Sequence, residues 1–122
     1  MNVLLVALGG AVGAAARYLL DEFTKAQLGS DFPWGTFIIN VSGSLLIGVV
    51  AGLISNEILP GWAQPLFVVG VLGGYTTFST YSQDNLELLM AGNFGAALLN
   101  ALGQVILGLA GVYVGLLFFR GL

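Results

Sequence analysis

The sequence predicts an all-α membrane protein with four transmembrane helices in a single domain that spans residues 1–122. Three observations support this fold class: 57% of the residues are hydrophobic, only 7% are charged, and long uncharged stretches separate the charges. A soluble domain carries roughly a quarter charged residues. This composition is therefore typical of a chain that is solvated by lipid.

The charged residues divide the chain into its predicted helices. A spanning helix needs about 20 mostly apolar residues, and each uncharged stretch provides that length, the first by continuing past Arg17. We expect helices near residues 3–20, 35–54, 63–83 and 95–118. Residues 21–31 then form a polar connector, and residues 56–64 form a tight turn.

Basic residues give little indication of the orientation of the chain in the membrane. Four helices place both termini on one side, where Arg120 is the only basic residue, against Arg17 and Lys25 on the other side. The side richer in Lys and Arg normally faces the cytoplasm. Either this weak bias lets the chain insert both ways up, which favours an antiparallel assembly, or one residue suffices to orient it.

The residue types that are missing exclude several functions. The chain has no histidine, no cysteine and only three basic residues. This excludes a Cys/His metal site, an imidazole or thiolate catalyst, and a basic surface for nucleic acid. No acidic residue lies in the central third of a predicted helix, which argues against proton-coupled antiport. We therefore expect neither an enzyme nor an antiporter.

Small residues recur at four-residue spacing in the predicted helices, as in Gly9-x-x-x-Gly13, Ser44-x-x-x-Gly48-x-x-x-Gly52 and Gly111-x-x-x-Gly115. Such faces let helix backbones approach closely in lipid. They predict a compact bundle and say nothing about its chemistry.

Polar side chains inside predicted helices are the candidate functional residues, because each is costly in lipid unless it meets a partner or water. Asn40 lies in the second helix, with Gly43 and Ser44 on the same face. Asn100 and Gln104 lie one turn apart in the fourth. These stripes form either interhelical hydrogen bonds or a hydrated path, and their number in so small a bundle favours the path.

The third predicted helix carries the most distinctive segment, Gly73-Gly74-Tyr75-Thr76-Thr77-Phe78-Ser79-Thr80-Tyr81-Ser82. Glycine and threonine weaken a helix, and hydroxyl side chains offer its backbone other partners. We expect an interruption close to mid-membrane, where non-helical backbone survives only inside protein or beside water. Its freed carbonyls would suit a monovalent cation. The alternative is an unbroken helix whose hydroxyls bond to carbonyls one turn back.

The groups that such a path offers are amide N–H groups, hydroxyls and aromatic ring edges, which are electropositive. Together with Arg17 at one mouth, they predict a pathway for a small anion. Arg17 is otherwise an interface residue whose guanidinium reaches toward the lipid headgroups.

Three motifs resemble the bacterial fluoride channel family, called Fluc or CrcB. They are Gly9-Gly10-x-x-Gly13-Ala14-x-x-Arg17-Tyr18, Gly35-Thr36-x-x-x-Asn40, and the segment from Gly73 to Ser82. The resemblance runs the whole chain, and the third motif is highly specific. It implies a multi-pass channel of the plasma (inner) membrane that exports cytoplasmic fluoride down its electrochemical gradient. It also implies an antiparallel, dual-topology homodimer with two pores and a sodium ion (Na+) buried at its centre.

The resemblance further implies roles in the fluoride pore for Arg17, Asn40, Phe78, Ser79, Thr80, Tyr81 and Asn100. Phe78 and Tyr81 match two pore phenylalanines, and Ser79 and Thr80 match the hydroxyls of a polar track. The backbone carbonyls of Gly73 and Thr76 would bind the sodium, four of them from two chains. The family usually has Phe where this chain has Tyr81, whose phenol adds a donor.

Two other classes of protein stay open. A small multidrug-resistance exporter shares the size and dual topology, but it needs a membrane-embedded glutamate in its first helix, where this chain has Ala and Gly. A structural assembly or holin-like pore former does not need a patterned run of hydroxyl side chains such as that in residues 73–82. Fluoride efflux from loaded liposomes separates these classes.

Overall fold

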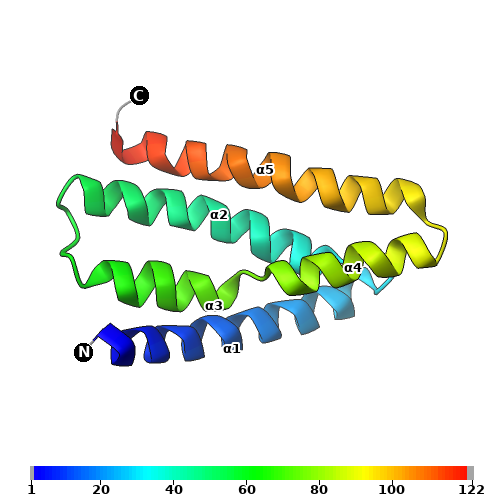
Figure 1. Cartoon of the computed structure of the whole chain (residues 1–122), viewed down its shortest axis with the longest axis horizontal. Helices are drawn as coiled ribbons and strands as arrows, with labels where there is room; N and C mark the ends of the chain where they lie inside the picture. Colours follow the sequence, from blue (N-terminus) through cyan, green and yellow to red (C-terminus); the bar gives the residue numbers. More distant parts are fainter. Residues whose placement is uncertain (1, 121–122) are drawn as a thin grey trace.

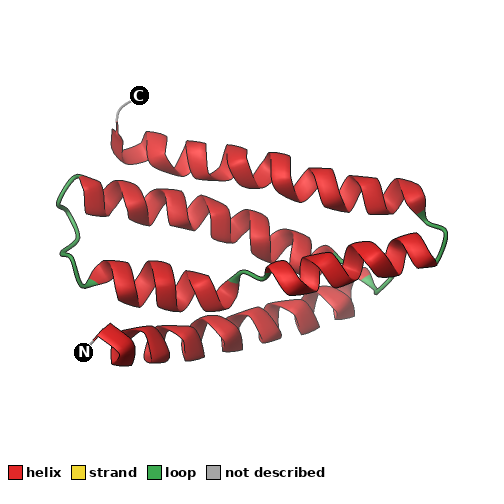
Figure 2. Cartoon of the chain, viewed as in Figure 1, coloured by secondary structure: helices red, strands yellow, loops and turns green. Residues whose placement is uncertain are grey.

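The structure, a computed structural model, describes residues 2–120, with side chains as far as residue 118. Over that range the regular elements are helices: α1 (Asn2–Leu28), α2 (Trp34–Ser55), η1 (Gln64–Leu72), α3 (Gly73–Tyr75), α4 (Phe78–Met90) and α5 (Phe94–Arg120). The chain runs up and down the bundle four times (Figure 1). The third pass consists of η1 and α3, a short non-helical link, and α4 (Figure 2).

Three helices in the described range are long and apolar enough to cross a membrane: α1, α2 and residues Phe94–Phe118 of α5. The start of α1, the turn after α2 and the end of α5 lie at one end of the bundle (Figure 1). This is the arrangement that four passes require. The side chain of Arg120, on which the comparison of basic residues depends, lies outside the described side chains.

Two helices run further than the sequence predicts. The prediction of a polar connector at residues 21–31 is wrong for most of that range, which belongs to α1. α1 continues to Leu28, and Gly29, with a φ of 82°, follows it. Asp21 and Lys25 form an ion pair of 3.0 Å one turn apart, which supports these extra turns. α4 likewise continues to Met90. Charges mark where contact with lipid ends, whereas the helical hydrogen bonds continue until a residue such as glycine ends them.

Glycine faces bring the helices into contact. α1 packs against η1 and α3, and α2 packs against α5. A Cβ atom added to Gly9 would meet the backbone of η1, and one added to Gly48 would meet the backbone of α5 at Val112. The prediction that small residues mediate packing is confirmed within the chain.

Replacement of Gly13 by alanine is expected to destabilise the bundle strongly. The new Cβ would collide with the carbonyl oxygen of Val71 and lie 2.9 Å from the Tyr75 nitrogen, and backbone atoms cannot swing aside. We expect a loss of about 3 kcal/mol or more in the free energy of unfolding. Gly10→Ala is the matched control, because its Cβ would have no neighbour closer than 4.0 Å. Thermal unfolding of both variants in detergent tests the difference, and equal midpoints would contradict it.

Candidate functional site

The link between α3 and α4 is a two-residue helix break at Thr76 and Thr77. Both residues are extended, with φ and ψ of −82° and 157° at Thr76 and −151° and 122° at Thr77. The Thr76 hydroxyl donates to the Leu72 carbonyl over 2.9 Å. The Thr77 hydroxyl accepts a hydrogen bond from the Thr80 peptide N–H and so caps α4. The Thr77 hydroxyl therefore caps the start of α4, and the Thr76 hydroxyl bonds back to the turn before the break.

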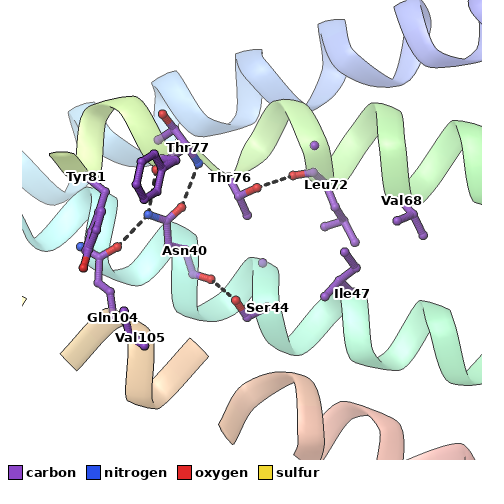
Figure 3. Close-up of a pocket in the computed structure, with 13 residues that line it drawn as sticks. Asn40, Ser44, Ile47, Val68, Leu72, Thr76, Thr77, Tyr81, Gln104 and Val105 are labelled. Atoms are coloured by element: carbon purple, nitrogen blue, oxygen red, sulfur yellow. Dashed lines mark hydrogen bonds between the residues drawn. The ribbon is translucent and has the colours of Figure 1, made fainter. Parts of the chain in front are cut away.

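Asn40 of α2 bonds to both sides of the Thr77 residue. Its Oδ1 accepts from the Thr77 peptide N–H over 2.9 Å, and its Nδ2 donates to the Thr77 carbonyl over 3.0 Å (Figure 3). The same Nδ2 donates to Oε1 of Gln104 in α5 over 2.7 Å. One amide thus accepts the Thr77 N–H, which has no helical partner at the break, and ties three passes together.

Arg17 and Gly43 also support the break. The Arg17 Nε donates to the Gly74 carbonyl over 3.1 Å, so this guanidinium lies against the last turn of α3. Gly43 lets α2 approach the break, because a Cβ there would collide with the Thr76 side chain and lie 3.3 Å from the Tyr75 ring.

The break changes the partners of the carbonyl groups around it, and those of Gly73 and Thr76 are two of them. In a continuous helix the Thr77 N–H would bond to the Gly73 carbonyl and the Thr80 N–H to the Thr76 carbonyl. Here the first donates to Asn40 and the second donates to the Thr77 hydroxyl. The Gly73 and Thr76 oxygens are thereby released from the helical pattern, and so is that of Gly74, which accepts from Arg17.

A pocket of about 340 Å³ opens beside the break, between α2, the third pass and α5. Its lining combines Asn40, Gly73, Thr76, Phe78 and Tyr81 of the predicted site (Figure 3). Ser79, Asn100 and Arg17 do not line it. Ser79 is exposed, with its hydroxyl 3.3 Å from that of Thr77, and Asn100 is fully buried in the bundle.

The two aromatic rings at the start of α4 have different surroundings. Phe78 is 78% exposed, whereas Tyr81 is half-buried and its phenol donates to the Ala101 carbonyl over 2.6 Å. The ring centroids are 5.7 Å apart. The Phe78 ring therefore has most of its surface available to something outside this chain.

A second pocket, of about 440 Å³, lies where the end of α1 meets the start of α2 and the middle of α4. Thr80 lines it together with the charged residues Asp21, Lys25, Asp31, Asp84 and Glu87. Lys25 is paired with Asp21, so the pocket is acidic overall. We call it the acidic pocket.

Three residues at or near the site are absent from the set that the sequence singles out for the pore. They are Thr77, Gln104 and Asn85, and Asn85 accepts from the Asn100 amide over 2.7 Å. Gln104 carries a signal in the sequence, since it continues the polar stripe of Asn100. Asn85 carries none, because it stands between Asp84 and Glu87, in a segment whose charges are typical of a solvated helix.

The chain is similar to proteins of known family along its full length. The sequence profile described as CrcB-like protein, camphor resistance (CrcB), matches residues 4–116. A curated protein of Magnetococcus marinus named fluoride-specific ion channel FluC is 44% identical and aligns over 98% of both chains. A Thermus thermophilus protein of the same name is 47% identical over 92% of this chain and 88% of its own. FluC 2 of Nitrobacter hamburgensis is 46% identical over 100% of this chain and 99% of its own. A profile match over nearly all of the chain and full-length relatives at this identity lead to one conclusion: the chain belongs to the CrcB-like family of multi-pass membrane proteins.

Proposed function

We propose that this chain is a fluoride-selective ion channel, which lets fluoride leave the cytoplasm passively across the plasma (inner) membrane. The observation that carries the proposal is the helix break held by Asn40, with amide, hydroxyl and aromatic groups gathered beside it. The names of the full-length relatives agree with it. A channel of this kind carries out no covalent chemistry and is not an enzyme.

Fluoride would move by exchanging its water shell for hydrogen-bond donors of the chain. Both N–H groups of Asn40 already donate, one to the Thr77 carbonyl and one to the Gln104 oxygen. Fluoride would take over the second of these, because it ends on a side-chain oxygen whereas the Thr77 carbonyl belongs to the backbone. Fluoride would displace that oxygen at Asn40, with hydroxyls of Ser79 and Thr80 and the ring edge of Phe78 as further partners.

The pathway is completed, in this proposal, by a second copy of the chain in the opposite orientation. The exposed Phe78 ring supports this, because a pore ring must face the ion and not lipid. The weak difference in basic residues between the two sides supports insertion both ways up. The antiparallel homodimer would then contain two pores.

Single cysteines report on dual topology, since the natural chain has none. We expect Asn2→Cys, labelled by an impermeant reagent from outside intact cells, to be modified in about half of the molecules. Asn93→Cys, in the turn before α5 and hence at the other end of the bundle, is expected to give the complementary half. Uniform labelling at either position, all or none, would exclude dual insertion.

A sodium ion at the dimer centre is part of the same proposal. The released carbonyl oxygens of Gly73 and Thr76 fit it, because carbonyl oxygen is a ligand that hard cations prefer, and two chains would supply four. When bound, the ion would neutralise clustered carbonyl dipoles and hold the two breaks together. Within each chain, hydrogen bonds from Arg17 to the Gly74 carbonyl and from Asn40 to the Thr77 carbonyl hold the backbone of the break, and these bonds do not involve the ion.

Removal of sodium is therefore expected to weaken the dimer. After prolonged dialysis against a large organic cation, we expect dissociation in detergent and loss of fluoride flux, with both restored when sodium is returned. Prolonged dialysis is needed because a buried ion exchanges slowly. A dimer and a flux indifferent to this treatment would exclude the sodium site.

Fluoride efflux from liposomes tests the channel itself. Vesicles loaded with potassium fluoride receive valinomycin, so that potassium balances the charge and efflux follows the anion permeability. We expect rapid fluoride release and no comparable chloride release from matched vesicles. Equal release of both anions would indicate a nonselective pore, and release that requires a proton gradient would indicate a coupled exporter.

A further inference from the structure

Four side-chain amides form a continuous row from the helix break to the middle of α4. The first link, from Asn40 to Gln104, is described above. Gln104 Nε2 donates to Asn100 Oδ1 over 2.8 Å, and Asn100 Nδ2 donates to Asn85 Oδ1 over 2.7 Å. We call these four residues the amide row.

The backbone of Thr77 sets the direction of the amide row. A peptide N–H can only donate and a carbonyl can only accept. The two backbone groups of Thr77 therefore fix the positions of the oxygen and the nitrogen of the Asn40 amide. Asn40 then points an N–H at Gln104, and each later amide accepts from the one before it and donates to the next. The row therefore ends with Asn85 presenting its oxygen.

Burial makes this order matter. Asn100 is 0% exposed and Gln104 is 6% exposed, so neither amide can exchange its partner for bulk water. A buried donor without an acceptor is costly, and in a row of amides the loss at one link loosens the others. Asn85 is the half-buried member on which the last donor depends.

We propose that Asn85 is a positioning residue for the pathway, acting through Asn100 and Gln104 on Asn40. Without the Asn85 oxygen, Asn100 can turn its amide over and Gln104 can follow. Gln104 would then present an N–H to the N–H of Asn40 and push that residue away from Thr77. The expected effect of Asn85 on fluoride flux rests on the proposed function as a fluoride channel. The direction of the hydrogen bonds in the amide row does not depend on that function.

Substitutions that keep or remove one acceptor test the direction. Asn85→Asp keeps the oxygen that Asn100 needs, whereas Asn85→Leu removes it. We expect a thermal unfolding midpoint near that of the natural protein for Asn85→Asp, and a drop of about 5 °C or more for Asn85→Leu. Gln83→Leu is the matched control on the same helix, because Gln83 is exposed and bonds only to Glu87 across the surface.

Fluoride efflux separates positioning from a merely structural role. At a temperature where every variant is folded, we expect Asn85→Leu to slow efflux about tenfold relative to Gln83→Leu, and Asn85→Asp to restore most of it. The side-chain amide NMR signal of Gln104, two links away from Asn85, is expected to shift in Asn85→Leu and not in Gln83→Leu.

Several results would overturn the proposal. They are an unchanged midpoint in Asn85→Leu, an equal drop of the midpoint in Asn85→Asp and Asn85→Leu, or an efflux rate and a Gln104 signal that match the Gln83→Leu control. If the natural protein carried no fluoride, the proposed function would fail, and the midpoints and the Gln104 signal would still decide whether Asn85 orients the row.

Discussion

Asn40→Asp is expected to abolish fluoride flux. One carboxylate oxygen still accepts from the Thr77 N–H, but the other faces the Thr77 carbonyl and the Gln104 oxygen, which lie 3.0 and 2.7 Å from the present nitrogen. The new negative charge also stands where the anion passes. Two like charges about 4 Å apart repel by about 4 kcal/mol at an effective dielectric constant near 20, which corresponds to roughly a thousandfold slower passage.

Asn93→Asp is the matched control for this variant, because it adds the same charge in the exposed turn before α5. Initial fluoride efflux from liposomes gives the comparison, and we expect natural rates for the control. Natural efflux in Asn40→Asp would place the pathway away from the helix break.

Phe78→Ile is expected to slow fluoride flux by at least about tenfold while the chain still folds. The ring is 78% exposed, so its loss removes little packing within the chain. An aliphatic side chain of similar bulk lacks the electropositive ring edge, whose contacts contribute about 1 kcal/mol or more each. Efflux and the thermal unfolding midpoint are measured on the same preparation, and an unchanged efflux rate would remove Phe78 from the pore.

Tyr81→Phe provides the matched aromatic control. It keeps a ring and loses only the hydrogen bond to the Ala101 carbonyl, which contributes about 1 kcal/mol to stability. We expect efflux within about twofold of the natural rate, since the family that the sequence resembles usually has Phe at this position. A large loss of efflux would instead assign the phenol a direct part in conduction.

The sequence predicts the passes of this fold better than their ends. Uncharged stretches locate the passes, because apolar length is what a membrane requires, although only α1, α2 and α5 are continuous helices long and apolar enough to span it in the described range. These stretches place the end of the first helix too early. The charges of Asp21 and Lys25 predict an end to the helix, whereas the two residues form an ion pair one turn apart that stabilises it. The low helix propensity of residues 73–82 is also apparent from the sequence, because glycine and threonine lower helix propensity at their own positions.

The contacts that build the site are long-range, and a single sequence contains little information about them. Asn40 is recognisable as a costly polar residue, but nothing local indicates that it bonds to both sides of Thr77. The same holds for Asn85, because its proposed role depends entirely on the buried amide of Asn100 in α5. Local chemistry identifies which residues need partners, and only the packed bundle determines the partners.

The acidic pocket has a consequence for the electrical behaviour of the proposed dimer. In one chain it lies at one end of the bundle only, so a single orientation would place its negative charge on one side of the membrane. Such one-sided charge lowers the local concentration of anions there and would make the current rectify. Two antiparallel copies, as proposed, would place one acidic pocket at each face. Their combined current–voltage relation would then be symmetric, and salt added to either side would screen it equally.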